Sequence, residues 1–87
     1  MIHNTELPPY GNNWPALAEE LGDLRYDALA DFLQAMSDKM CKDGDADLGR
    51  ERGKLARELY ISANELQAAS EAITRAWGIC APFMEKG

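Results

Sequence analysis

The sequence predicts an all-α protein built as a long antiparallel helical hairpin. Apolar residues recur at alternating steps of three and four through most of the chain, and no segment alternates as a strand does. A short segment rich in aspartate and glycine separates two such regions, and two long helices joined by a short turn must lie antiparallel. In the second region the apolar positions form one seven-residue stripe, which we expect to be the contact with the first helix: Leu48, Leu55, Leu59, Leu66, Ile73 and Cys80.

The first helix is expected over residues 14–43, after an irregular arm over residues 1–13. Pro8 and Pro9 disfavour a helix in the arm, because proline lacks a backbone donor and restricts the residue before it. Asn12 or Asn13 is a suitable N-cap, and Pro15 falls in the first turn, where proline is tolerated. The first helix therefore has a well-defined predicted start.

The turn is expected over residues 44–46, with Gly44 in the left-handed conformation that commonly ends a helix. The second helix then covers residues 47–80 and stops before Pro82. The hairpin as a whole covers residues 14–81, followed by a C-terminal tail over residues 82–87.

This arrangement predicts which residues of the two helices meet. Trp14 and Trp77 are almost equally distant from the turn, so they are expected to meet at the open end of the hairpin. Arg52 occupies a stripe position where leucine is expected and falls near Asp38. A partly buried ion pair between these two side chains would fix the register of the helices rather than add stability.

More apolar surface is present than one hairpin can cover, because each helix has only one neighbour. Leaving half of such a stripe in water would forfeit several kcal/mol at roughly 25 cal/mol per Å². We therefore expect a homodimer that forms a four-helix bundle; the alternative is a monomer whose N-terminal arm covers the surplus. The residues that offer this second interface, or a site for another protein, are Phe32, Met36, Tyr60, Ile61 and Ala68.

Composition limits the class of protein. The 87 residues suffice for one small domain, and a net charge of −6 with a pI near 4.6 argues against a general nucleic-acid binder. Neither a membrane-spanning segment nor a secretory signal is recognisable, so a soluble, cytoplasmic protein is expected. Cys41 and Cys80 are expected to be free, buried thiols, and no cofactor is indicated.

The segment near the turn resembles part of a calcium-binding loop. Asp43, Asp45 and Asp47 match the first, third and fifth ligand positions of an EF-hand. Leu48 then stands where the loop needs glycine, and Lys54 stands where it needs the bidentate glutamate. We expect these aspartates to cap the second helix and solvate the turn, and no specific metal site to form.

Catalysis is not expected, because His3 is the only histidine and no phosphate-binding glycine loop is present. The predicted function is that of a small non-catalytic protein, an adaptor or regulator, that acts through protein–protein interaction. The alternative is a nucleic-acid-associated bundle that uses a small basic patch on the second helix. This patch consists of Arg50, Lys54 and Arg57.

Overall fold

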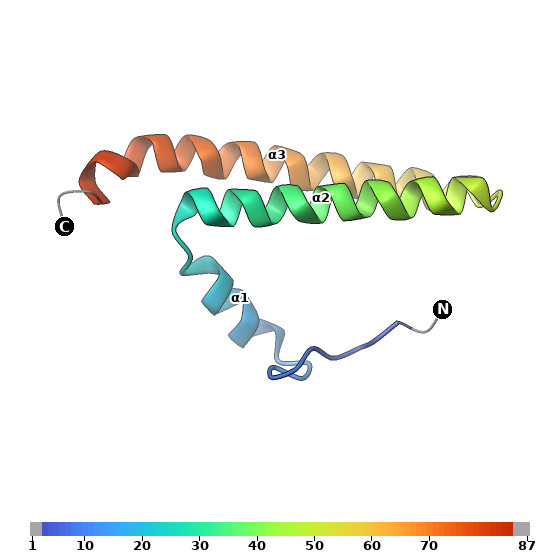
Figure 1. Cartoon of the computed structure of the whole chain (residues 1–87), viewed down its shortest axis with the longest axis horizontal. Helices are drawn as coiled ribbons and strands as arrows, with labels where there is room; N and C mark the ends of the chain where they lie inside the picture. Colours follow the sequence, from blue (N-terminus) through green and yellow to red (C-terminus); the bar gives the residue numbers. More distant parts are fainter. Residues whose placement is uncertain (1–2, 85–87) are drawn as a thin grey trace.

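The computed structural model describes residues 3–84 of the chain and is all-α. Its helices are α1 (Trp14–Gly22), α2 (Tyr26–Gly49) and α3 (Gly53–Met84). Figure 1 shows α2 and α3 side by side along the long axis, with α1 and the arm turned away from the pair. The prediction of an all-α fold with a long antiparallel helical pair is confirmed. None of the described helices is both long and apolar enough to cross a membrane.

Helix α1 begins where the sequence predicts. The Asn13 side chain accepts a hydrogen bond from the backbone N–H of Ala16 at 3.2 Å, and Pro15 lies in the first turn. The prediction of one continuous helix over residues 14–43 is wrong, however, because α1 ends at Gly22. Glycine favours a helix end, since it has the greatest backbone freedom to lose in a helix interior.

Helix α2 restarts after a three-residue break. Arg25 has extended backbone angles, and its guanidinium group holds the Asp27 carboxylate with N–O distances of 2.7 and 2.8 Å. The same carboxylate accepts the backbone N–H of Ala28 at 2.9 Å. The negative charge at this helix N-terminus is favoured by the helix dipole, and the arginine holds the pKa of Asp27 below its usual value.

The turn lies at residues 50–52, six residues later than the predicted turn at 44–46. Glu51 there adopts the left-handed conformation, with φ of 61°, that the sequence suggested for Gly44. Gly44 instead lies inside α2, where a Cβ atom would stand 2.8 Å from Cε1 of Tyr60. Glycine at this position permits a close contact between helices and does not end a helix.

Helix α3 also differs from the predicted helix over residues 47–80. It starts at Gly53 and continues through Pro82 to Met84, so the predicted tail over residues 82–87 is helical as far as Met84. Residues 85–87, the remainder of that tail, lie outside the described residues. Pro82 has no backbone N–H to donate to the carbonyl of Gly78, so α3 passes this residue with one helical hydrogen bond fewer.

The contact between α2 and α3 is made by small residues rather than by the leucine stripe. Ala56 and Ala63 are 1% exposed, Ala30 and Ser37 are 3% exposed, and no large side chain among the described residues is fully buried. These positions recur every seventh residue, which keeps them on one side of each helix. We call them the small-residue seam: Ala30, Ser37 and Gly44 of α2, with Ala56, Ala63 and Ser70 of α3.

Two hydrogen bonds across the small-residue seam define the register. The Ser37 hydroxyl donates to the Ala63 carbonyl, and the Ser70 hydroxyl donates to the Ala30 carbonyl, both at 2.7 Å. In each bond the two residue numbers add to 100, so residue n of α2 lies level with residue 100 − n of α3. A serine hydroxyl can reach the partner helix's backbone only where the helices approach closely, so the seam is a tight contact.

The same register places the last part of α3 beyond the end of α2. Since Tyr26 begins α2, residues 75–84 of α3 extend beyond it by about 15 Å, at 1.5 Å per residue. Figure 1 shows this C-terminal overhang of α3 past the start of α2. The predicted meeting of Trp14 and Trp77 is wrong, because α1 is a separate helix and Arg25 covers the Trp77 ring, with its Cζ 5.2 Å from the ring centroid.

Candidate interaction surface

Most large apolar side chains of the hairpin gather on one side of it. In α3, Leu55 precedes the seam residue Ala56 by one position, and the next three residues of the predicted stripe each follow a seam residue by three, so this part of the stripe flanks the contact with α2 instead of filling it. The predicted stripe residue Leu48 lies in α2. Asp43 and Asp47 of α2 share a hollow with Leu55 and Leu59, and side chains seven residues apart in a helix lie on the same side. This rule places the following residues on one apolar face: Leu29, Leu33, Met36 and Met40 of α2, with Leu55, Leu59, Leu66, Ile73 and Cys80 of α3.

The apolar face and the side chains next to it remain accessible to solvent. Met36 and the neighbouring Phe32 are each 37% exposed, and Leu55 is 46% exposed. The monomeric alternative requires the N-terminal arm to cover Phe32 and Met36. The described part of the arm, residues 3–13, leaves both side chains exposed. Leu29, Leu33, Met40, Leu59, Leu66 and Ile73 are half-buried. In packed proteins, a helical surface with this apolar composition is normally covered by another helix.

The C-terminal overhang is the most exposed apolar segment of the described chain. Ile79 and Phe83 are 74% and 73% exposed, and Met84 is 58% exposed. Phe83 stands seven residues after Ala76 and three after Cys80, so it continues the apolar face beyond the end of α2. The hairpin thus carries an exposed apolar extension at its open end.

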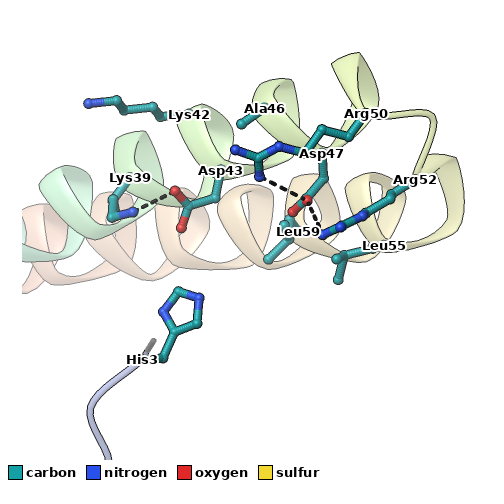
Figure 2. A pocket seen from close by; sticks show the side chains of 10 residues that line it. All are labelled: His3, Lys39, Lys42, Asp43, Ala46, Asp47, Arg50, Arg52, Leu55 and Leu59. Carbon is teal, nitrogen blue, oxygen red and sulfur yellow. Dashed lines mark hydrogen bonds and ion pairs between the residues drawn. The ribbon is translucent and has the colours of Figure 1, made fainter. Parts of the chain in front are cut away.

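At the other end, near the turn, the apolar face borders a hollow of about 670 Å³. Figure 2 shows its ten lining side chains, with His3 of the arm on one side and the hairpin on the other. Leu55 and Leu59 supply its apolar wall. Four cationic side chains and two carboxylates also line it: Lys39, Lys42, Arg50, Arg52, Asp43 and Asp47.

The two carboxylates in this hollow are already held by cations. Asp47, a buried residue, lies 3.7 Å from Arg50 and 3.5 Å from Arg52, and Asp43 lies 2.5 Å from Lys39. The predicted ion pair between Arg52 and Asp38 is therefore wrong. Because the turn lies closer to the C-terminus than predicted, Arg52 pairs with Asp47 in the last turn of α2 and does not reach Asp38 in the middle of that helix.

The three aspartates of the calcium-like segment point to three separate partners. Asp43 and Asp47 bind the cations just described, and Asp45 accepts the Tyr60 hydroxyl at 2.5 Å. This hydrogen bond to a carboxylate raises the pKa of Tyr60. All three lie within α2, so the expectation that they cap the second helix is wrong. Among the described residues, no group of three or more histidine, cysteine or acidic side chains is placed to hold a metal ion.

The structure separates the residues of the predicted basic patch. Arg50 follows the last residue of α2 and pairs with Asp47, whereas Lys54 and Arg57 lie in the first turns of α3 and are exposed. Arg50 therefore does not share a helical face with the other two residues. This arrangement offers a smaller continuous basic surface than the sequence suggests.

The predicted interaction residues also fall in different places. Tyr60 packs its ring against Gly44 inside the hairpin, while Ile61 is 39% exposed and Ala68 is exposed on the outward side of α3. Both cysteines are free thiols, but Cys41 is exposed and Cys80 is half-buried, so the expectation of buried thiols is wrong for Cys41. Sequence reasoning missed the exposed overhang mainly because it continued the first helix back to residue 14, which would have covered this part of α3, and also because it ended the second helix before Pro82.

The arm is held at its base. The Tyr10 hydroxyl donates to the Glu20 carboxylate of α1, which raises the pKa of Tyr10, and the backbone N–H of Leu7 donates to the Gly11 carbonyl at 2.9 Å. A cis peptide bond joins Pro8 to Pro9. Residues 3–13 form an arm in which Leu7 and Gly11 make an isolated bridge, and residues 1 and 2 lie outside the described residues.

Together these features define a class of protein: a close-packed helical hairpin with one unpartnered apolar face. Comparison with protein-family models, with curated proteins and with solved structures found no match to this chain. The function is therefore argued from the surface of the hairpin itself.

Proposed function

We propose that this is a non-catalytic protein that acts through protein–protein contacts made by its apolar face. The first such contact is with a second copy of the chain, which completes a four-helix bundle. The observation that carries the proposal is the make-up of the hairpin interior, where the most buried described residues are alanine, serine and glycine. Large apolar side chains normally supply most of the burial energy of a domain, and here they line a surface.

The total accessible area supports the proposal. The chain exposes 6831 Å². A compact monomer of 9.6 kDa would expose about 5,100 Å² by the usual scaling of area with mass. The difference of roughly 1,700 Å² exceeds the 800 Å² or so that each partner contributes to an interface of ordinary size. An association of ordinary size that covers the apolar face would remove about half of this excess.

The charges near the turn favour a protein partner over nucleic acid. Arg50 and Arg52 both lie near Asp47, and Lys39 pairs with Asp43, so most of the cations nearest the apolar face are partly neutralised from within the chain. A phosphate backbone would have to compete with these carboxylates in a chain of net charge −6. A helical protein partner could bind the apolar face without displacing these carboxylates from the cations.

In the proposed bundle the outward side chains remain free to bind another protein. Ile61 and Ala68 lie on the outward side of α3, and the arm offers Leu7, which is 49% exposed. These surfaces suit an adaptor or regulator, in which a self-associated core presents separate docking segments.

The test is co-expression of a tagged and an untagged chain, followed by affinity capture of the tag. The wild-type untagged chain should be retained. Leu66→Asp, made in both chains, should abolish retention because it places a charge at the centre of the apolar face. Ile61→Asp is the matched control, since it places the same charge on the outward side of the same helix and should leave self-capture intact. Equal retention of all three pairs would refute the proposed role of the apolar face.

A further inference from the structure

Resting on the proposed function, we infer that the second copy lies antiparallel across the apolar face, with each C-terminal overhang seated in the hollow beside the other copy's turn. The two exposed apolar ends of the hairpin are then each other's partners. The overhang presents Cys80 and Phe83, and the hollow presents Leu55 and Leu59.

The unequal lengths of the helices are the first argument. Helix α3 has 32 residues and α2 has 24, and the register places residues 75–84 of α3 beyond the end of α2, where Arg25 lies over the Trp77 ring. An antiparallel second copy places its own turn end beside these residues, because the two hairpins then run in opposite directions. Each overhang gains a neighbour, and each turn end gains an apolar cover.

The stripe on α3 is complementary to itself when it is reversed. Its centre lies between residues 67 and 68, and pairing it with an antiparallel copy about that point opposes residues whose numbers add to 135. Each pair then joins a large side chain with a smaller one, as interdigitated cores require. The pairs are Leu55 with Cys80, Leu59 with Ala76, Ile73 with Ser62, and Leu66 with Ala69.

Helix α2 places the two-fold axis at nearly the same level. The midpoint of Leu29, Leu33, Met36 and Met40 lies between residues 34 and 35, which the register of the hairpin places level with residues 65 and 66 of α3. The apolar residues of the two helices are therefore centred within about 3 Å of each other along the long axis, at 1.5 Å per residue. A two-fold axis near that level buries both sets together.

Charge favours the antiparallel arrangement over the parallel one. Four cationic side chains and two carboxylates line the hollow, which leaves a net charge of +2 (four minus two), and a parallel dimer would bring two such hollows together at one end. The parallel dimer would also place both C-terminal overhangs at the other end, where neither overhang lies beside a turn of the other copy. In the antiparallel dimer each cationic hollow receives an apolar and aromatic segment, and the Phe83 ring comes opposite the Arg52 guanidinium group.

Disulfide trapping tests this register. In a Cys41→Ser background, Cys80 is the only thiol, and Leu55→Cys adds a second thiol that the register places opposite Cys80 of the other copy. Copper-catalysed air oxidation, which removes two electrons and two protons from each thiol pair, should convert most of this variant to a species of twice the chain mass on a non-reducing gel. The two positions are 25 residues apart on one helix, too far to link within one chain.

Matched variants in the same background separate the outcomes. Ser62→Cys adds a thiol on the same face one heptad further along, and it should cross-link at least tenfold more slowly than Leu55→Cys. Faster linking of Ser62→Cys would mean a dimer shifted by one heptad, and efficient linking of Cys41→Ser alone would mean a parallel dimer; either result overturns the inference.

The native mass of the reduced proteins distinguishes this failure from a failure of the proposed function. A reduced dimer in which Leu55→Cys does not link overturns the antiparallel register but leaves self-association intact. A reduced monomer overturns both proposals. The circular dichroism of each variant should match that of the parent, which confirms that the helices are retained.

Discussion

Replacing Gly44 by alanine tests the close contact between α2 and α3 most sharply. Alanine is a better helix former than glycine by about 1 kcal/mol, so the substitution would stabilise an isolated helix. In this hairpin the new Cβ atom would stand 2.8 Å from Cε1 of Tyr60 and 3.1 Å from two further ring atoms. The ring cannot move away freely, because its hydroxyl donates to Asp45.

The expected result is a net loss of stability. Overpacking of this kind costs roughly 1–3 kcal/mol, which outweighs the gain in helix propensity. Gly44→Ala should therefore lower the free energy of unfolding by about 1 kcal/mol. Gly78→Ala is the matched control, because Gly78 also lies inside a helix but a Cβ atom added there would meet nothing within 4 Å; it should raise that free energy by about 1 kcal/mol.

The assay is urea denaturation followed by circular dichroism of the helices, with all proteins at one concentration because a dimer's stability depends on it. The double variant Gly44→Ala/Tyr60→Ala should recover part of the loss, since it removes the ring that the methyl group meets. If Gly44→Ala stabilised the protein as much as Gly78→Ala does, Tyr60 would not lie against Gly44 and the register of the hairpin would be wrong.

Three further predictions concern the seam, the phenol and the aspartates. Ala63→Leu should destabilise the protein by about 3 kcal/mol in urea denaturation, whereas Ala68→Leu on the outward side should change stability by less than about 0.5 kcal/mol. The pKa of Tyr60 is raised in the folded protein, so its hydrogen bond to Asp45 stabilises the fold fully at pH values below the usual tyrosine pKa. This stabilisation is lost as the pH rises through the higher pKa of the folded state. Wild type should therefore lose helix more steeply above about pH 10 than Tyr60→Phe does. Calorimetric titration with calcium at physiological ionic strength should give no stoichiometric micromolar binding, because each aspartate of the calcium-like segment already has its own partner.

The sequence predicts the type of fold because periodicity and helix start signals are local. The Asn13 cap with Pro15 marks the start of α1, and the spacing of apolar residues requires helices. The break after Gly22 is harder to predict, because a single glycine inside a helical pattern is usually tolerated. Gly22 ends the helix here because Arg25 and Asp27, three and five residues later, start a new one.

The position of the turn depends on packing and cannot be predicted from local propensity. The Asp43–Asp47 segment has a composition typical of a turn, but Gly44 continues the heptad of Ala30 and Ser37 and meets Tyr60. Two seven-residue patterns run side by side along α3, one of leucines and one of small residues. The sequence shows both, and only the structure establishes that the small residues form the contact within the chain.

The central claim is that the hairpin exposes its large apolar side chains so that a second copy can cover them. Sedimentation velocity of the wild-type chain, measured across a dilution series in the micromolar range, tests this claim most directly. We predict a single species of about twice the 9.6 kDa chain mass, which dissociates only on strong dilution. A species of 9.6 kDa that persists over the whole series, with the helices intact, would contradict the claim.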